Sequence, residues 1–201
     1  MTETIRPVLH HVTMKTTRID EMVDWYGRAV GMTPNFHGPE GAWMTNDEAN
    51  HRVALLSAPG LSDDADKIAH TGMHHLAFEY ANLGDLLSSY ERMRDIGIVP
   101  HAALDHGLTM SLYYVDPDGN SVEPQSDNFG DWAASGEWMR TAPEFKANPI
   151  GVHFDPDQMW AAWKGGAEEA ELRQRAFTGE FDPGKPLDLR LPTADGAEPV
   201  R

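Results

Sequence analysis

The chain contains no cysteine among its 201 residues. Disulfide bonds and thiolate metal sites are therefore excluded, and any bound metal must use imidazole or carboxylate ligands. No apolar run reaches the roughly 18 residues that a membrane-spanning helix needs, so we expect no membrane segment. The N-terminal residues lack the basic and then apolar composition of a signal peptide, and we expect a cytoplasmic protein.

Basic residues are also scarce. The chain has 16 Lys and Arg against 32 Asp and Glu, which gives a formal net charge of −16. A surface with this charge repels phosphate backbones, so we expect no nucleic-acid partner. Hydrophobic residues make up 40% of the chain, enough to form a core.

Two stretches of the sequence follow the same plan. LHHVTMKTTRIDEMVDWYGRAVGMTP begins at Leu9, and MHHLAFEYANLGDLLSSYERMRDIGIVP begins at Met73. Each opens with two histidines and an apolar strand, continues into an amphipathic helix, and ends in an apolar–Gly–apolar–x–Pro segment. His11 and His75 are 64 residues apart. Two diverged copies of one unit explain this spacing.

Short apolar segments after each helix predict three more strands in each copy. In the second copy, DPDG at residues 116–119 is a strong turn signal between two of these strands. The predicted fold class is α+β, with two strand–helix–strand–strand–strand (βαβββ) modules at about 8–60 and 73–127. We expect the modules to form a curved mixed sheet.

The predicted domain organisation has two parts. Residues 1–127 form the paired modules, and residues 128–201 form a C-terminal helical extension and tail. Beyond Phe181 the tail is rich in Pro, Gly and Asp, so we expect an extended, partly ordered terminus. Four of the six tryptophans lie between Trp132 and Trp163. This region should bury apolar surface against the main sheet, a neighbouring subunit, or both, and we expect a homo-oligomer.

The repeat places a histidine pair at the start of each module, His10–His11 and His74–His75. Successive side chains of a strand point to opposite faces, so one histidine of each pair can face a shared cavity. Glu123 is the candidate for a carboxylate ligand, because it is a lone charge between apolar neighbours in a predicted strand. A single strand histidine is more often a hydrogen-bonded core residue, but the repeat favours a site. Two histidines and one carboxylate are the ligands of non-haem Fe(II) oxygenases.

The double βαβββ unit with HHV, HHL and DPDGNSVEP resembles the vicinal oxygen chelate superfamily. Within it, the sequence is most similar to type I extradiol dioxygenases, which cleave catechol rings. The resemblance covers roughly residues 8–127, and FKANPIGVHFDPDQMW resembles the C-terminal extension of single-domain members. It implies that His11, His75 and Glu123 bind Fe(II), or alternatively Mn(II), and that His10 and His74 point away from the metal.

The resemblance also implies three catalytic residues. DHGLTMSLYYVDPDGN is similar to the family segment with a substrate-pocket histidine and a tyrosine, here His106 and Tyr113. NHRVAL is similar to the strand with the acid–base histidine of the O2 pocket, here His51. The implied substrates are O2 and a catechol, with 2,3-dihydroxybiphenyl as the first to test. Candidates for the apolar ring pocket are Trp43, Met44, Met110 and the C-terminal aromatic residues.

Two other functions are compatible with the same fold. A glyoxalase-type metal isomerase or lyase would use a fourth ligand, a carboxylate in the first module. Ala54 stands at the position that corresponds to Glu123, which argues for three ligands instead. A metal-free ligand-binding protein of the bleomycin-resistance type has no use for the three ligands, so their presence argues against it.

Overall fold

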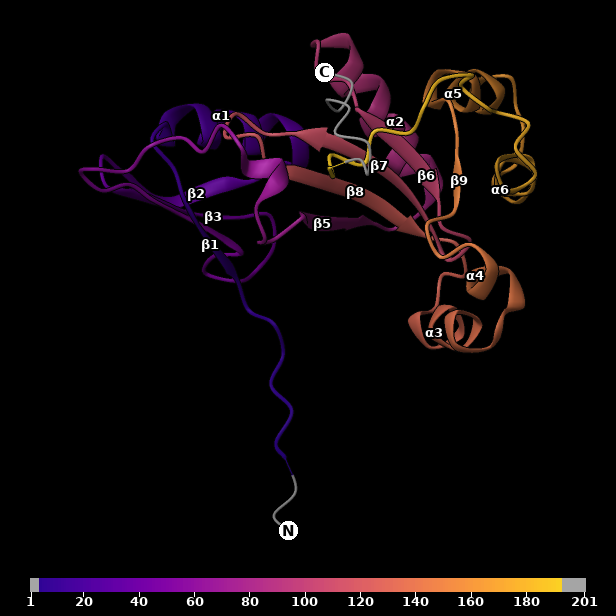
Figure 1. The fold of residues 1–201 in the computed structure, drawn as a ribbon, viewed down its shortest axis with the longest axis horizontal. Coiled ribbons are helices and arrows are strands. Elements are labelled where there is room, and N and C mark those ends of the chain that lie inside the picture. Colours follow the sequence, from indigo (N-terminus) through magenta and orange to yellow (C-terminus); the bar gives the residue numbers. More distant parts are fainter. Residues whose placement is uncertain (1–3, 193–201) are drawn as a thin grey trace. The chain divides into compact units, whose positions relative to one another are not determined.

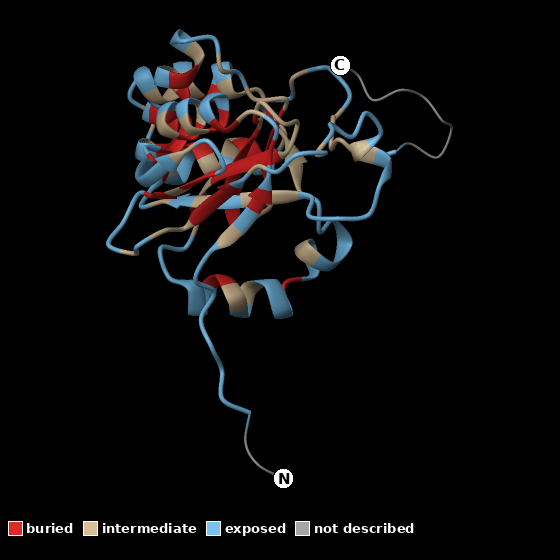
Figure 2. Cartoon of the chain, turned by 90° about the vertical axis from the view of Figure 1, so that its left-hand side faces the viewer, coloured by how far each residue is buried: buried red, intermediate tan, exposed pale blue. Residues whose placement is uncertain are grey.

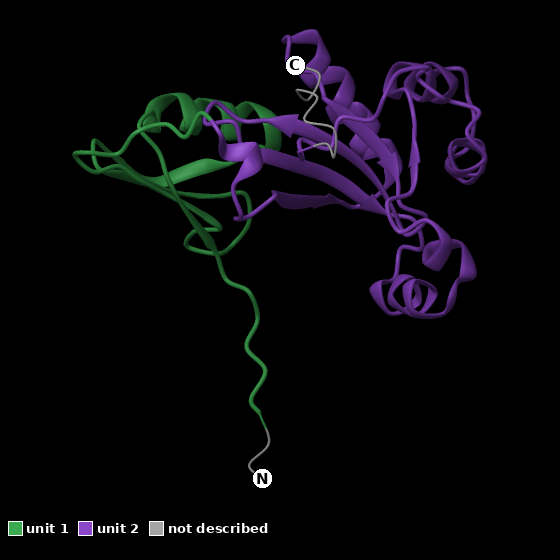
Figure 3. Cartoon of the chain, viewed as in Figure 1, with its two compact units in different colours: residues 1–65 green, residues 66–201 purple. Residues whose placement is uncertain are grey.

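The computed structural model describes residues 4–192, and the chain divides into two compact units (Figure 3). The first unit comprises residues 1–65 and the second residues 66–201. The boundary falls inside the polar segment 61–72 that joins the two copies of the repeat. The C-terminal extension belongs to the second unit.

Both units have the predicted order of elements (Figure 1). The first contains β1 (Val12–Lys15), α1 (Ile19–Val30), β2 (Thr33–Gly38), β3 (Gly41–Thr45) and β4 (Val53–Leu56). After a short 3-10 turn, η1 (Lys67–Ala69), the second contains β5 (His75–Tyr80), α2 (Leu83–Asp95), β6 (Ala102–Asp105), β7 (Thr109–Val115) and β8 (Ser121–Asp127). The extension adds α3 (Trp132–Thr141), α4 (Pro143–Ala147), β9 (Val152–His153), α5 (Pro156–Lys164) and α6 (Glu169–Phe177).

Each unit has its own mixed sheet, and the two sheets share one strand order. The first runs β1-β4-β3-β2, and the second runs β5-β8-β7-β6 with β9 added at the edge. The first and last strands of each module pair in parallel, and the other neighbours are antiparallel. Identical topology in both copies confirms the α+β fold of two βαβββ modules with a C-terminal helical extension.

The two module helices pack through the apolar positions that the repeat predicts. In α1 the buried side chains include Ile19, Met22 and Tyr26, and Gly31 ends the helix in the left-handed conformation with φ 70°. In α2 the Asn82 side chain accepts a hydrogen bond from the backbone N–H of Asp85 and caps the first turn. Burial therefore follows helical periodicity in both units (Figure 2).

The second sheet has two distinct faces. The hydroxyl groups of Tyr80 on β5 and Ser89 on α2 are hydrogen-bonded at 2.7 Å. The face of the strand that carries Tyr80 therefore lies against α2. Val122 and Tyr114 are cross-strand partners on the same side, and both are completely buried. Since side chains alternate along a strand, His75 must lie on the opposite face. We call this opposite side the site face.

The extension covers parts of both faces. On the helix side, α5 packs beside α2, and the Arg94 guanidinium lies 4.2 Å from the centre of the Trp160 ring. On the site face, the Trp132 indole of α3 donates to Glu79 of β5 at 2.9 Å. Figure 1 shows α5 and α3 on opposite sides of the strands. The extension therefore packs on the main sheet, although Trp132 remains 73% exposed.

None of the helices in the described part of the chain combines the length and the apolar character that crossing a membrane requires.

Leu86 offers a test of the packing behind β8. Its side chain is 1% exposed in α2, so Leu86→Ala should lower the free energy of unfolding by about 2–5 kcal/mol. Urea denaturation followed by circular dichroism measures this loss. Ser88→Ala, on the exposed side of the same helix, is the control and should change stability by less than about 0.5 kcal/mol. Equal losses in both variants would contradict this packing.

Candidate active site

A tight turn fixes the hairpin that carries two of the predicted site residues. Asp116, between β7 and β8, accepts hydrogen bonds at Oδ1 from the backbone N–H groups of Asp118 (3.0 Å) and Asn120 (2.8 Å). Gly119 adopts φ 77°, a conformation that suits glycine. The turn sets the register in which Tyr113 of β7 and Glu123 of β8 meet.

Glu123 is a buried carboxylate with two strong partners. Its side chain is 7% exposed. The Tyr113 hydroxyl donates to Oε1 at 2.7 Å, and His75 Nε2 lies 2.9 Å from Oε2. A buried carboxylate is stable only with such compensation, so the three side chains form one unit on the site face.

His106 extends this network by one residue. It follows β6 directly, and its Nε2 lies 2.8 Å from the Tyr113 hydroxyl. Because that hydroxyl donates its hydrogen to Glu123, its oxygen accepts the bond from His106. The result is a hydrogen-bonded chain from His106 through Tyr113 to Glu123.

Burial and the network shift the pKa values of these groups in consistent directions. Burial, together with the charge of Glu123, raises the pKa of the Tyr113 hydroxyl, which stays protonated at neutral pH. Burial would raise the pKa of Glu123, but hydrogen bonds from His75 and Tyr113 outweigh it and lower that pKa. The hydrogen bond to Glu123 raises the pKa of His75, and burial lowers the pKa of His106.

The neighbouring His74 determines which nitrogen of His75 is free. His74 Nε2 lies 2.8 Å from the carbonyl oxygen of Leu189, so this nitrogen carries a hydrogen. The Nδ1 of a neutral His74 then accepts from His75 Nδ1, which is 2.9 Å away. His75 therefore presents its Nε2 to the Glu123 carboxylate. Two lone pairs at 2.9 Å repel each other unless a proton or a metal cation lies between them.

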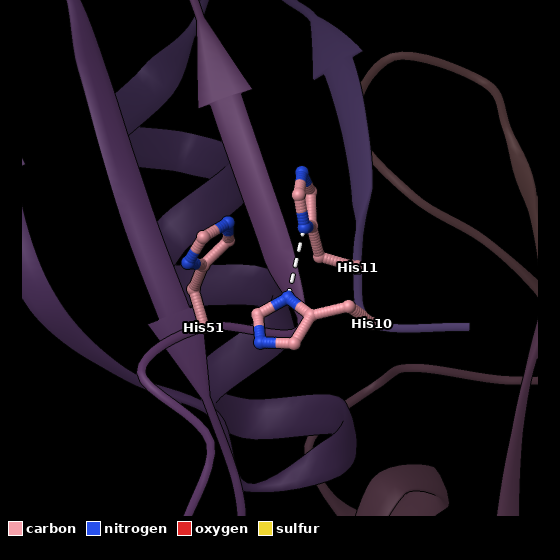
Figure 4. A group of neighbouring side chains, drawn as sticks. All are labelled: His10, His11 and His51. Carbon is pink, nitrogen blue, oxygen red and sulfur yellow. Dashed lines mark hydrogen bonds between the residues drawn. The ribbon is translucent and has the colours of Figure 1, made fainter. Parts of the chain in front are cut away.

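The first unit brings three other histidines together (Figure 4). His10 Nδ1 and His11 Nδ1 are 2.9 Å apart, and the ring centres of His11 and His51 are 4.3 Å apart. One ring nitrogen from each histidine lies within 4.8 Å of the others, so the group could hold a metal ion. Asn50 Oδ1 lies 2.7 Å from His51 Nδ1 and, as an acceptor, leaves His51 Nε2 without a hydrogen when the ring is neutral. Burial lowers the pKa of His51.

His10 does not point away from His11, contrary to the expectation from strand alternation. β1 begins only at Val12, so both histidines precede the strand and its alternation does not apply to them. His74 likewise precedes β5, and its ring lies edge-on to that of His75, with the centres 5.1 Å apart.

The predicted site residues thus gather in two groups. The second unit brings together His75, Glu123, Tyr113 and His106, and the first brings His11 next to His51. The registers support the match between Glu123 and Ala54. Thr13, two residues after His11, pairs with Ala54, and Ala77, two residues after His75, pairs with Glu123.

Two candidates for the ring pocket were wrong. Met44 and Met110 are completely buried in the cores of their units, where they are not available to a ligand. Trp43 is half-buried and lines a cavity of about 590 Å³ in the first unit.

The C-terminal tail contributes to the second unit in a way that the sequence did not predict. Leu187 and Leu189 pack against Tyr113, whereas we expected an extended, partly ordered terminus beyond Phe181. The sequence feature that could have predicted this contact is the alternation of Leu187, Leu189 and Leu191 in an otherwise polar segment. The part of the tail from residue 193 onward lies outside the described residues.

A family model described as Glyoxalase/Bleomycin resistance protein/Dioxygenase superfamily matches residues 8–123. The chain belongs to this superfamily. The resemblance to the vicinal oxygen chelate superfamily is confirmed, and the match covers both histidine pairs and ends at Glu123.

Two curated relatives in the superfamily come from Rhodococcus globerulus. Biphenyl-2,3-diol 1,2-dioxygenase 3 is 39% identical over 174 residues, which cover 87% of this chain and 91% of that protein. Biphenyl-2,3-diol 1,2-dioxygenase 2 is 39% identical over 183 residues, which cover 91% of this chain and 95% of that protein. Alignments of this length extend beyond the two modules into the C-terminal extension.

Solved structures share the fold at lower identity. A glyoxylase/bleomycin resistance protein/dioxygenase domain from Frankia sp. is 19% identical, with a TM-score of 0.54, over 64% of this chain and 96% of its own. A glyoxalase/dioxygenase from Nostoc punctiforme is 16% identical, with a TM-score of 0.52, over 63% of this chain and 98% of its own. They support the superfamily fold.

The ion pair between His75 and Glu123 predicts a pH-dependent coupling in the metal-free protein. The lowered pKa of Glu123 adds stability that is lost as pH falls through its folded-state pKa. The raised pKa of His75 adds stability that is complete below pH ~6.5 and is lost as pH rises through its folded-state pKa. The coupling should therefore be favourable near pH 5.5 and weak near pH 9.

A double-mutant cycle of His75→Ala and Glu123→Gln, with chelator present, measures this coupling from urea denaturation at both pH values. The same coupling energy at both values would show that the two side chains do not form an ion pair.

Proposed function

We propose that this protein is a metal-dependent extradiol dioxygenase that uses O2 to cleave the ring of a catechol. The observation that best supports this proposal is the buried unit of Glu123, His75 and Tyr113. In it, an imidazole and a carboxylate converge beside a protonated phenol. The names of the two Rhodococcus relatives support biphenyl-2,3-diol, that is 2,3-dihydroxybiphenyl, as the first substrate to test. A homo-oligomer and a cytoplasmic location stay predictions from the sequence.

His75 and Glu123 fit two ligand positions of one metal ion. Nitrogen and oxygen ligands at about 2.1 Å from an ion, at right angles to each other, lie about 3.0 Å apart. The observed separation of His75 Nε2 from Glu123 Oε2 is 2.9 Å. We assign His11 as the third ligand, because it holds the position in the first copy of the repeat that His75 holds in the second.

This ligand set suits Fe(II), with Mn(II) as the alternative. When bound, the ion would leave open positions for the catechol and O2 and would supply the redox chemistry between them.

The remaining polar residues would handle protons and orient the substrate. The Tyr113 hydroxyl stays protonated and donates its one hydrogen to Glu123, so its oxygen can accept a hydrogen bond from a catechol hydroxyl. His106 donates to that hydroxyl and holds it in place. A catechol must lose at least one proton on binding, and His51, neutral near pH 7 because its pKa is lowered, is the base we assign.

The glyoxalase-type alternative would need another carboxylate. The register places Ala54 opposite Thr13, just as Glu123 lies opposite Ala77. Ala54 has no carboxylate, so the first module does not supply this ligand. A metal-free binding protein would leave the buried Glu123 carboxylate without a catalytic role.

The proposed activity is tested by loading the protein anaerobically with Fe(II), adding a panel of catechols, and recording O2 uptake and the yellow ring-opened product. We expect turnover that is highest with 2,3-dihydroxybiphenyl. His75→Ala and Glu123→Gln should each reduce it by more than about 100-fold. His37→Ala, an exposed histidine of the first unit, should leave it unchanged. Activity with Zn or Ni on a glutathione hemithioacetal, and none on catechols, would replace this proposal by the glyoxalase-type function.

Metal content tests the ligand assignment separately from turnover. After Fe(II) loading and gel filtration, His11→Ala, His75→Ala and Glu123→Gln should each retain far less than one iron per chain. His10→Ala should retain the wild-type stoichiometry, because His10 is outside the proposed ligand set. If His10→Ala loses iron and Glu123→Gln keeps it, the ion is bound by the histidines of Figure 4 and our assignment is wrong.

A further inference from the structure

A short C-terminal segment lies on the site face of the second sheet. We call residues 187–190, Leu-Asp-Leu-Arg, the C-terminal strap. Its two leucines pack against a small buried cluster formed by Ala102 and Leu104 of β6 and Tyr113 of β7. Ala102 and Tyr113 are direct cross-strand partners, so the strap covers two neighbouring strands of the sheet.

Three hydrogen bonds hold the strap in place. Two come from histidines that bond to its backbone carbonyls, and the third comes from the strap's own Arg190. His74 Nε2 donates to the carbonyl oxygen of Leu189 at 2.8 Å, and His101 Nδ1 lies 3.0 Å from the carbonyl oxygen of Asp188. The Arg190 guanidinium reaches back to the carbonyl oxygen of Gly119, in the β7–β8 turn, at 3.2 Å. These bonds fix the path of the strap without using the leucine side chains.

The anchors also connect the strap to the candidate site. His74 is hydrogen-bonded to the proposed ligand His75, and Gly119 belongs to the turn that aligns Tyr113 with Glu123. Tyr113 itself has two roles in the contacts. Its hydroxyl donates to Glu123, and its side chain belongs to the cluster against which the leucines pack.

The strap is an apolar neighbour of a catechol held beside Glu123 and Tyr113, because its leucines pack against the cluster to which Tyr113 belongs. The dihydroxylated end of the substrate needs the polar groups at the metal, whereas a second aromatic ring needs apolar neighbours. Leu187 and Leu189 are only partly buried, so they still present apolar surface. Met110 of the same sheet is sealed in the core on the opposite face.

We propose that Leu187 and Leu189 form the wall of the substrate pocket that contacts the part of a catechol beyond its dihydroxylated ring. The strap thereby favours bicyclic over monocyclic catechols, and His101 is a positioning residue that holds it. This inference rests on the proposed dioxygenase function.

The leucine variants test the wall. The ratio of kcat/KM for 2,3-dihydroxybiphenyl to that for unsubstituted catechol should fall about 10-fold or more in Leu187→Ala/Leu189→Ala. Leu191→Ala is the matched control, because Leu191 is 50% exposed just beyond the strap, and it should keep the wild-type ratio. An unchanged ratio in a double variant with wild-type circular dichroism would overturn the proposal.

His101 tests the anchoring. His101→Ala should raise KM for 2,3-dihydroxybiphenyl several-fold while kcat for unsubstituted catechol stays near the wild-type value. His101→Asn keeps a donor near the position of Nδ1 and should restore KM. Equal losses of kcat on both substrates, without rescue by Asn, would assign His101 a merely structural role.

Anaerobic calorimetry of the Fe(II)-loaded protein separates this inference from the proposed function. If no catechol is turned over, the dioxygenase proposal fails, but a preference for binding 2,3-dihydroxybiphenyl that is lost in the double leucine variant would still support the strap. If turnover occurs and the preference survives the leucine substitutions, only the strap proposal fails. Neither turnover nor binding of any catechol would overturn both.

Discussion

The buried charge of Glu123 is the constraint on which the second unit depends. A carboxylate on a side chain that is 7% exposed is destabilising unless hydrogen bonds or a cation compensate it. The protein supplies Tyr113 on one oxygen and His75 on the other, and these partners come from two different strands of the sheet. The Asp116 turn keeps the β7–β8 hairpin in the register that makes this possible. Local turn chemistry and site electrostatics are therefore directly linked.

The two copies of the module have kept one topology and diverged in chemistry. Both sheets have the same strand order, and Ala54 and Glu123 occupy matching register positions. The second copy concentrates the carboxylate and its partners, whereas the first concentrates imidazoles at His10, His11 and His51. A duplicated scaffold can change single residues such as Ala54 and Glu123 because the side chains that pack under the helix of each module lie on the opposite face of its sheet.

The positions of the segments in the extension are set by different interactions from those that set the elements of the modules. α5 and α6 pack on the helix side and the edge of the second sheet, while α3 and the C-terminal strap lie on the site face. None of these placements follows from periodicity, because short amphipathic helices and polar tails can dock on any complementary surface. The strap is held by backbone carbonyls, which every sequence possesses, so its anchoring leaves little trace in its own residues.

The sequence alone determined the repeat, the βαβββ order, the buried stripes of α1 and α2, and the two histidine pairs and Glu123 as candidate ligands, because these depend on local periodicity, on turn chemistry and on the spacing of the repeat. The choice of His75, Tyr113 and His106 came from the resemblance of their motifs to a known family. Only the tertiary structure decided that His10 lies beside His11, that Met44 and Met110 are sealed in the cores, and that Leu187 and Leu189 cover Tyr113. Strand ends, the choice of face and long-range docking depend on contacts between residues far apart in the sequence, and no local pattern encodes them.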